Sequence, residues 1–344
     1  MNLTTLPLEM VLVVFLAAAV TIAVAGTRIA RVADRLADAT GWGEAIFGAV
    51  FLGLGTSLPG IVTSITAAAD GHAELSISNA LGGIAAQTAF LAIADIFYRK
   101  ANLEHAAASL PNMMQGALLI VLLMGVGLFA TAPQTSLFAI HPGSIVLFLA
   151  YFFGVRMIGT ARRKVTWRAS PTPETVPDVP DPGANRAGRS TARLWLRFCW
   201  LGLVVALGGY LVARSGLILS ARTGLSETVV GALFTAVATS LPELVTCLAA
   251  VRAGALTLAV GNIIGGNTFD VLFVATSDLA YRQGSIYGAF TDRQLFLLAL
   301  TATLTGILLL GLLRREKRGI ANIGFESFLV LALYLASLVL LASW

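Results

Sequence analysis

Charged residues are scarce in this sequence. Only 12% of its 344 residues are Asp, Glu, Lys or Arg, and 57% are hydrophobic, whereas soluble domains carry about 25% charged residues. The mean hydropathy is +0.84. This scarcity excludes a soluble globular fold and predicts a polytopic membrane protein whose surroundings are a lipid bilayer. The net charge of +5 does not require a nucleic-acid partner, because the basic residues gather in particular loops, as membrane topology demands.

Other residues and motifs are also few or missing. The two cysteines, Cys199 and Cys247, fall in different predicted helices, and we expect both to be packed apolar thiols. Only three histidines exist, all near predicted loops, so neither Ser57 nor Ser240 has an evident base, and an intramembrane hydrolase is disfavoured. No G-x-x-x-x-G-K-[ST] loop is present, so a nucleotide partner and ATP-driven pumping are not supported. We expect no enzymatic activity and no cofactor beyond a transiently bound, transported cation.

Long apolar runs predict ten transmembrane helices, five in each half of the chain. The first begins directly, since no positive charge precedes it and a cleaved signal peptide is not expected. An odd number of helices in each half inverts the second half relative to the first. The predicted spans are residues 8–27, 43–69, 74–97, 112–131, 142–160, 195–215, 226–251, 255–279, 294–313 and 323–342.

The distribution of basic residues predicts the orientation. The loops after the odd-numbered helices, with the helix ends that adjoin them, hold 19 of the 23 Lys and Arg residues. The positive-inside rule assigns these loops to the cytoplasm and both termini to the outside of a bacterial or archaeal inner membrane. The chain then divides into a first repeat (1–160), a Pro-rich, disordered cytoplasmic linker (161–194) and a second repeat (195–344). The sequence leaves the oligomeric state open, a monomer included.

An internal duplication relates the two halves at a constant offset of 183 residues. Between Thr40 and Asp95, 21 of 56 positions are identical to their partners, where roughly 5 would match by chance. The conserved blocks include Thr56-Ser57-Leu58-Pro59, which matches Thr239 to Pro242. Paired, interrupted apolar segments in two halves of a chain indicate a secondary transporter and its substrate site.

The second of these blocks carries acids inside apolar runs. Glu243 follows Pro242, and Asp270 ends the stretch Gly261-Asn262-Ile263-Ile264-Gly265-Gly266-Asn267-Thr268-Phe269-Asp270. A carboxylate within the membrane is costly and marks a functional site by default. Each proline removes a helix hydrogen bond, so we expect freed carbonyls near Gly55 and Ala238, which with the hydroxyls would supply hard oxygen ligands for Na⁺ or Ca²⁺.

These motifs resemble the sodium/calcium exchanger (cation/proton/Ca²⁺ antiporter) superfamily, whose two repeats each carry G-T-S-L-P-E followed by G-N-x-x-G-S-N. The resemblance covers residues 26–100 and 208–280. It implies an all-α membrane fold of ten transmembrane helices in two inverted five-helix repeats. It also implies an acid after each proline and a polar residue 27 positions later, which here are Glu243 and Asp270 in the second repeat but Gly60 and Gln87 in the first.

We therefore interpret the chain as a divergent antiporter that exchanges Ca²⁺ or another inorganic cation for Na⁺ or H⁺. Two acids offer a formal charge of −2, enough for one Ca²⁺ or for one Na⁺ with a proton, and poor for several Na⁺ at once. Exchange of a monovalent cation for protons stays an alternative, and so does a transport-inactive binding or regulatory protein of the same fold. The candidate ligands are Glu243, Asp270, Thr239, Ser240, Asn267, Thr56, Ser57 and Gln87.

Several other polar residues have competing interpretations. Arg31 with Asp95, and Arg214 with Asp278, are predicted to form one ion pair in each repeat, unless the arginines only extend to the membrane surface. The paired glycines at 82, 83, 265 and 266 are candidates for close helix packing. Asn79 and Asn262 are candidate ligands or caps. Glu44 and Glu227 open predicted helices and suit capping, and His72 and Glu74 are expected in a solvated outer loop.

Overall fold

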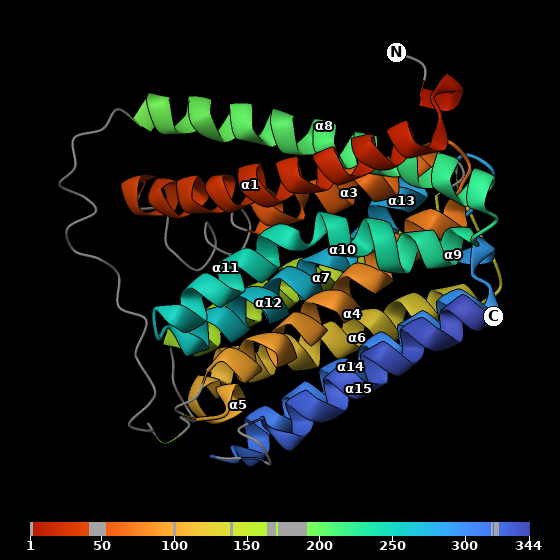
Figure 1. Ribbon diagram of the computed structural model, residues 1–344. Coiled ribbons are helices and arrows are strands. Elements are labelled where there is room, and N and C mark those ends of the chain that lie inside the picture. Colours follow the sequence, from red (N-terminus) through yellow and green to blue (C-terminus); the bar gives the residue numbers. More distant parts are fainter. Residues whose placement is uncertain are drawn as a thin grey trace.

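The computed structural model describes residues 3–40, 53–98, 101–137, 140–163, 170, 191–317, 319 and 323–344. These residues form helices and loops, which confirms the all-α class (Figure 1). The uninterrupted helices are α1 (Leu8–Thr40), α3 (Gly53–Ala69), α4 (Ala73–Phe97), α5 (Leu103–Ala107), α6 (Leu110–Thr131), α7 (Pro142–Arg163), α8 (Thr191–Thr223), α14 (Asp292–Arg314) and α15 (Phe325–Ser343). Two interrupted segments comprise α9 (Glu227–Val229), η4 (Val230–Thr235), α10 (Ala236–Thr239) and α11 (Leu241–Arg252), then α12 (Leu256–Asp270) and α13 (Leu272–Ala280).

Eight helices in the described part of the chain are long and apolar enough to cross a bilayer, and the bent segment from Glu227 to Arg252 makes a ninth if it counts as one span. The predicted span 43–69 is described only from residue 53, so the predicted total of ten is not tested there. Glu44 and most of the predicted linker 161–194 also lie outside the described residues. The predicted bounds of the linker are wrong at both ends, because α7 continues to Arg163 and α8 begins at Thr191.

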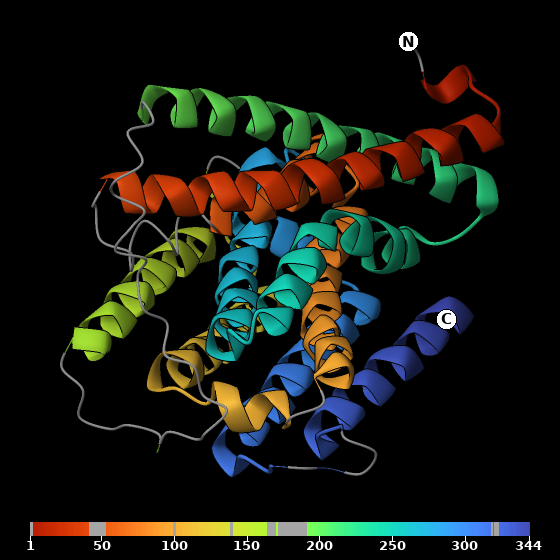
Figure 2. The same ribbon diagram turned by 60° about the vertical axis from the view of Figure 1, so that its left-hand side comes forward.

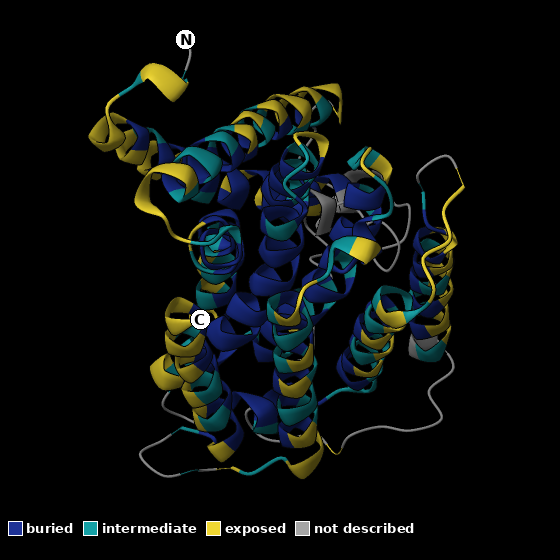
Figure 3. Ribbon diagram, turned by 90° about the vertical axis from the view of Figure 1, so that its right-hand side faces the viewer, coloured by how far each residue is buried: buried dark blue, intermediate teal, exposed yellow. Residues whose placement is uncertain are grey.

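The outer helices present apolar side chains to their surroundings. Large hydrophobic residues are exposed along α1, α7, α8 and α15, among them Val20, Phe153, Leu203 and Val339, while the helices between them are mostly buried (Figure 3). Such surfaces suit hydrocarbon, since lipid tails are as apolar as leucine. Cys247 is buried as predicted, but Cys199 is exposed on α8, so the prediction of a packed thiol is wrong there.

Helices α1 and α8 lie side by side and run in opposite directions (Figures 1 and 2). Each has 33 residues, which is longer than its predicted span. The basic segment after the apolar run of α1 continues as helix, and α8 extends both before residue 195 and after residue 215. Both chain termini lie at one end of the bundle, and α7 ends and α8 begins at the other (Figure 1). We call these the terminal end and the linker end.

The two prolines of the duplicated motif meet two glycines in a symmetric way. A Cβ added to Gly26 of α1 would overlap the ring of Pro242, and a Cβ added to Gly209 of α8 would overlap the backbone of Pro59. Both the glycines and the prolines are related by the offset of 183 residues. Each half of the chain therefore packs its proline against the long helix of the other half, and only glycine allows this approach.

The aspartates Asp95 and Asp278 each join three segments at one end of the bundle. Oδ1 of Asp95 accepts from the backbone N–H of Leu103 (2.7 Å), and Oδ2 accepts from that of Gly324 (2.9 Å). Asp278 accepts in the same way from Ile286 (2.9 Å) and His141 (2.7 Å). Every one of these residues lies 183 positions from its counterpart. We call these two groups the aspartate hubs.

The predicted ion pairs of Asp95 with Arg31 and of Asp278 with Arg214 are wrong, because both aspartates bind backbone N–H groups in the hubs. Arg214 pairs with Asp70 instead, and Arg31 is exposed whereas Asp95 is fully buried. The physical reason is that a helix start leaves backbone N–H groups without partners. A buried aspartate satisfies two such donors at once and needs no side-chain cation.

Candidate functional site

The second repeat bends sharply beside the acid Glu243. The π-helical turn η4 leads into α10, which ends at Thr239, and α11 restarts at Leu241 with a bend of 47°. Pro242, in the first turn of α11, cannot donate a helix hydrogen bond. Ser240 lies at the break, between the end of α10 and the start of α11, and its backbone φ and ψ of −96° and 5° depart from helix values. Such breaks are tolerated at membrane depth where protein covers them.

The first repeat does not show the same interruptions in its described part. Pro59 lies inside α3, which stays helical from Gly53 to Ala69. Helix α4, which carries Gln87, runs without a break from Ala73 to Phe97, whereas its counterpart stops at Asp270 and restarts as α13 at Leu272. The expected break near Ala238 is therefore observed, and the described residues of α3 contain no matching one.

Both acids are buried at the centre of the bundle and meet side chains of the first repeat. Glu243 is 5% exposed and Asp270 is 1% exposed. Ser57 Oγ donates to Asp270 Oδ1 (2.5 Å), and Gln87 Nε2 donates to Asp270 Oδ2 (2.7 Å). The amide of Gln87 also reaches Ser240 Oγ (3.2 Å), and the hydroxyl of Thr56 bonds to Glu243. Six of the eight candidate ligands thus meet in two hydrogen-bonded groups, one of Thr56 with Glu243 and one of Ser57, Asp270, Gln87 and Ser240.

The remaining two candidates, Thr239 and Asn267, direct their donors elsewhere. The Thr239 hydroxyl donates to the backbone carbonyls of Thr235 (2.9 Å) and Ala236 (3.2 Å) in its own helix. Asn267 Nδ2 donates to Thr88 Oγ1 (3.0 Å), which joins α12 to α4. Thr239 therefore makes the local bond that hydroxyls in membrane helices often make, while Asn267 keeps its oxygen uncommitted.

Three buried oxygens at this centre accept no hydrogen bond. They are Oε2 of Glu243, Oε1 of Gln87 and Oδ1 of Asn267. Buried polar atoms normally have a partner, and all three atoms are acceptors. No Lys, Arg or His in the described part of the chain forms an ion pair with either acid. A group of oxygens with this excess of negative charge suits a hard cation.

The comparisons with known proteins agree with this chemistry. A family model described as sodium/calcium exchanger protein matches residues 10–160 and 193–342, which is most of both halves. The chain belongs to the sodium/calcium exchanger family. It is 31% identical to the inner membrane protein YrbG of Escherichia coli K12 over 243 residues, 67% of each chain. It is 28% identical to the putative antiporter CaxA of Alkalimonas amylolytica over 288 residues, 79% of this chain and 82% of that one.

Solved structures share its fold. The sodium-calcium exchanger NCX_Mj aligns with a TM-score of 0.63 at 17% identity, covering 97% of this chain and 99% of that one. Native YfkE aligns with a TM-score of 0.62 at 15% identity, covering 96% and 92%. With its apolar helices and its family, this chain is an integral, multi-pass membrane protein.

Within this exchanger fold, the duplicated glycines differ in what they do. A Cβ on Gly82 would lie 2.5 Å from Cα of Ala232, so this glycine lets α4 and η4 touch. Gly83 and Gly266 instead face the polar centre. A Cβ added to Gly83 would lie 3.5 Å from Ser240 Oγ, and one added to Gly266 would lie 3.7 Å from Gln87 Oε1, both ordinary van der Waals distances. Packing explains Gly82, and access to the polar centre explains Gly83 and Gly266. A Cβ on the fourth, Gly265, would lie 3.3 Å from Nε2 of Gln115.

Sequence reasoning missed several polar residues that connect the exchanger's helices near this centre. Asn79 donates to Ser64 Oγ (2.9 Å) and to the carbonyl of Gly60 (3.2 Å), and it accepts from Thr235 Oγ1 (2.7 Å). Its partner by duplication, Asn262, is only half-buried. The duplication identified Asn79. It could not identify Ser64 and Thr235, because the positions related to them by the offset carry no hydroxyl residue.

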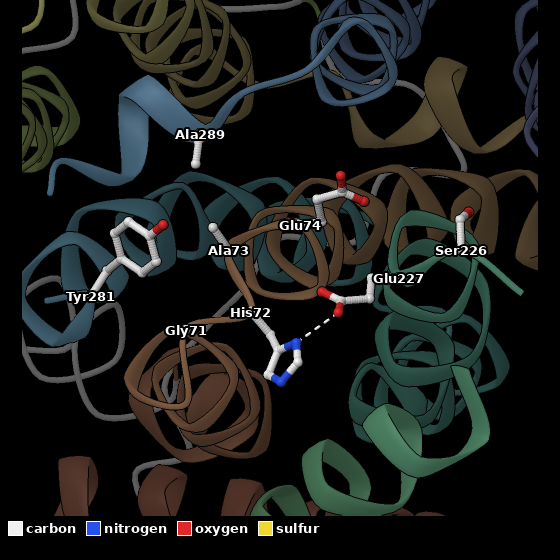
Figure 4. Close-up of a pocket in the computed structure, with 8 residues that line it drawn as sticks. All are labelled: Gly71, His72, Ala73, Glu74, Ser226, Glu227, Tyr281 and Ala289. Carbon is white, nitrogen blue, oxygen red and sulfur yellow. Dashed lines mark hydrogen bonds and ion pairs between the residues drawn. The ribbon is translucent and has the colours of Figure 1, made fainter. Parts of the chain in front are cut away.

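A surface pocket lies at the terminal end, away from these acids (Figure 4). Here His72 Nδ1 and Glu227 Oε1 are 2.6 Å apart, and Ser226, not Glu227, caps the helix by accepting from the N–H of Val229. Glu74 accepts from Thr228 Oγ1 at 3.3 Å. The predicted solvated loop therefore holds an ordered cluster. Glu227 opens α9 as predicted, but the side chain that caps the helix is that of Ser226.

Proposed function

We propose that this protein is a secondary-active cation antiporter with one central site, built around Glu243 and Asp270 and working by alternating access between two inverted five-helix repeats. The observation that carries the proposal is the set of three buried, unpartnered oxygens on Glu243, Gln87 and Asn267 beside two carboxyls. The basic residues at the linker end support its assignment to the cytoplasm and of both termini to the outside.

The charge of the site limits its cargo. Two carboxyls supply a formal −2, which one Ca²⁺ neutralises fully, as does one Na⁺ together with one proton. Ca²⁺ takes six to eight oxygens, and Ser57, Thr56, Ser240 and Gln87 supply neutral ones next to the acids. We therefore propose exchange of Ca²⁺ for Na⁺ or H⁺.

Exchange of a monovalent cation for protons is the second candidate. The observation that favours this candidate is the hydrogen bond that the neutral amide of Gln87 donates to Asp270. A carboxylate in the place of Gln87 would repel Asp270. A site with two acids and one donating amide can release its proton and bind Na⁺ without gaining net charge.

The test is flux through purified protein in lipid vesicles. Uptake of ⁴⁵Ca²⁺ and ²²Na⁺ is followed under imposed Na⁺ and pH gradients for the wild type, for Glu243→Gln and for Glu9→Gln, a control that removes a charge from the exposed start of α1. We expect cation uptake in the wild type and in the control, and none in Glu243→Gln. Unchanged uptake in Glu243→Gln would refute the assignment of the site, and no uptake of either cation by wild type would refute antiport.

A further inference from the structure

The duplication relates Gly60 to Glu243, so Gly60 marks where the first repeat would place an acid. The structure shows what fills this space. A Cβ at Gly60 would lie 2.6 Å from Cε2 of Phe273 and 3.2 Å from its Cζ. A contact under 3.0 Å is essentially never made by a Cβ atom, so either the ring or the backbone would have to shift. The ring of Phe273, from α13 of the second repeat, therefore excludes any side chain at position 60.

Phe273 is held in this position by its neighbours. It is 3% exposed and packs edge-to-face with Phe269, whose ring centroid is 6.4 Å away. Phe269 in turn packs edge-to-face with Tyr151 of α7 at 5.8 Å. Such aromatic pairs prefer this geometry and add to the stability of a packed core. The ring cannot swing aside without breaking this series, so the overlap at Gly60 is not relieved by a change of rotamer.

The position also matters to the site itself. The carbonyl of Gly60 accepts from Asn79 (3.2 Å), and Phe273 lies one helical turn after Asp270. The ring therefore occupies the space beside the backbone of Gly60, where the duplication predicts a carboxylate. An apolar ring offers no ligand to a hard cation, so at this position the first repeat supplies no acid to the site.

We infer that Phe273 is a specificity-determining residue, which fills the space of the first repeat's acid and limits the central site to a single cation. This inference rests on the proposed cation transport and adds its stoichiometry. With Phe273 in place the site holds one hard cation at a time, and exchange proceeds one bound cation for another.

The experiment combines an acid at position 60 with removal of the ring. Full-length wild type, Gly60→Glu, Gly60→Glu/Phe273→Ala and the shorter Gly60→Asp/Phe273→Leu are purified, and melting temperature and equilibrium binding of ⁴⁵Ca²⁺ and ²²Na⁺ are measured. The control is Gly60→Glu/Phe90→Ala, since Phe90 is buried and lies 183 residues before Phe273. It removes the same ring at the related position, away from Gly60.

We expect Gly60→Glu alone to fold poorly, and at least one Phe273 double variant, but not the Phe90 control, to recover the melting temperature. A Hill coefficient cannot exceed the number of sites. The Hill coefficient for Na⁺ binding should be about 1 in wild type and should exceed 1 in the variant whose melting temperature recovers. The third carboxylate should also tighten Ca²⁺ binding by roughly tenfold or more.

Three results would overturn the inference. They are normal folding and unchanged binding of Gly60→Glu, failure of both Phe273 double variants to fold better than Gly60→Glu, and a recovered variant that binds cations as wild type does. Absence of any cation binding or flux in wild type would instead refute the proposed function, so the two failures are distinguishable.

Discussion

The two halves of this exchanger are alike at their ends and different at their centre. At the ends, Asp95 and Asp278 bind backbone N–H groups at matching positions, and Pro59 and Pro242 pack on matching glycines. At the centre, the second half supplies both acids, and the first supplies Gly60 and Gln87. We infer from this difference that the packing of the helices depends on matching contacts in both halves, whereas the central negative charge can come from one half alone.

The largest effect should come from moving an acid between the halves. Asp270→Asn removes half of the central charge, and we expect cation flux to fall at least about 100-fold, since hydrogen bonds and ion contacts of charged groups contribute about 1.5–3 kcal/mol each. In Gln87→Asp/Asp270→Asn the acid returns at the related position, whose side chain lies 2.7 Å away in the wild type. We expect flux in vesicles to recover in part.

If the double variant is as inactive as Asp270→Asn, position 87 cannot stand in for position 270, and the centre is more asymmetric than the contacts imply. A melting temperature for each variant serves as the control for folding.

The next effect concerns the side chains beside the aspartate hubs, where Glu104 near Asp95 corresponds to Tyr287 near Asp278. At the linker end Ser327 Oγ donates to Glu104 Oε1 (2.5 Å), and at the terminal end the related Ser144 meets Tyr287 (3.1 Å). Burial, with Asp95 nearby, raises the pKa of the Glu104 carboxyl from 4.5 to about 7. The groups around it are Asp95, Ser327 and Glu326, which Arg314 contacts.

Because the pKa of Glu104 is higher in the folded than in the unfolded state, folding favours the proton. Stability should fall as pH rises from about 4.5 to about 7, by a few kcal/mol at most, at about 1.4 kcal/mol per pKa unit. Glu104→Gln should flatten the melting temperature between pH 5 and 8, whereas Tyr287→Phe should not, because tyrosine does not titrate there. An unchanged slope in Glu104→Gln would contradict this account of the hub.

A smaller effect tests the symmetry of the proline contacts. Gly26→Ala and Gly209→Ala each introduce a Cβ into the opposite proline, and overpacking of this kind costs about 1–3 kcal/mol. Gly306→Ala in α14 is the control, since nothing lies within 4 Å of its added Cβ, and it should stabilise by about 0.5–1 kcal/mol. Chemical or thermal unfolding in detergent measures all three, and a loss in only one of the glycine variants would show that the halves are not packed alike.

The sequence predicted much of this because hydropathy and duplication are strong signals. They indicated the apolar helices, the break before Pro242 and the acids Glu243 and Asp270. They could not indicate that Asp278 accepts from the backbone N–H of His141, 137 residues away. A carboxylate and an arginine in membrane segments instead favoured the prediction of an ion pair between Asp278 and Arg214. The packing of Phe273 on Gly60 also had no sequence signal, since both residues are apolar and their contact depends on how α13 crosses α3.

The length of α1 and α8 was underestimated for a related reason. Hydropathy marks the part of a helix that lies in lipid, but the segment from Arg28 to Thr40 continues as helix after the apolar run ends. Helix propensity, not hydropathy, decides where such a helix stops.

The most direct test of the central claim is the position of a bound cation in an experimental structure. Crystals of the wild type would be soaked with Sr²⁺ and, separately, with Tl⁺, as heavy stand-ins for a divalent and a monovalent cargo, and anomalous density would be measured. We predict one peak, bound by Glu243 and Asp270 with oxygens from Ser57 and Gln87 beside it. Two or more central peaks, or a peak that neither acid contacts, would contradict a site whose charge comes from one half of the molecule.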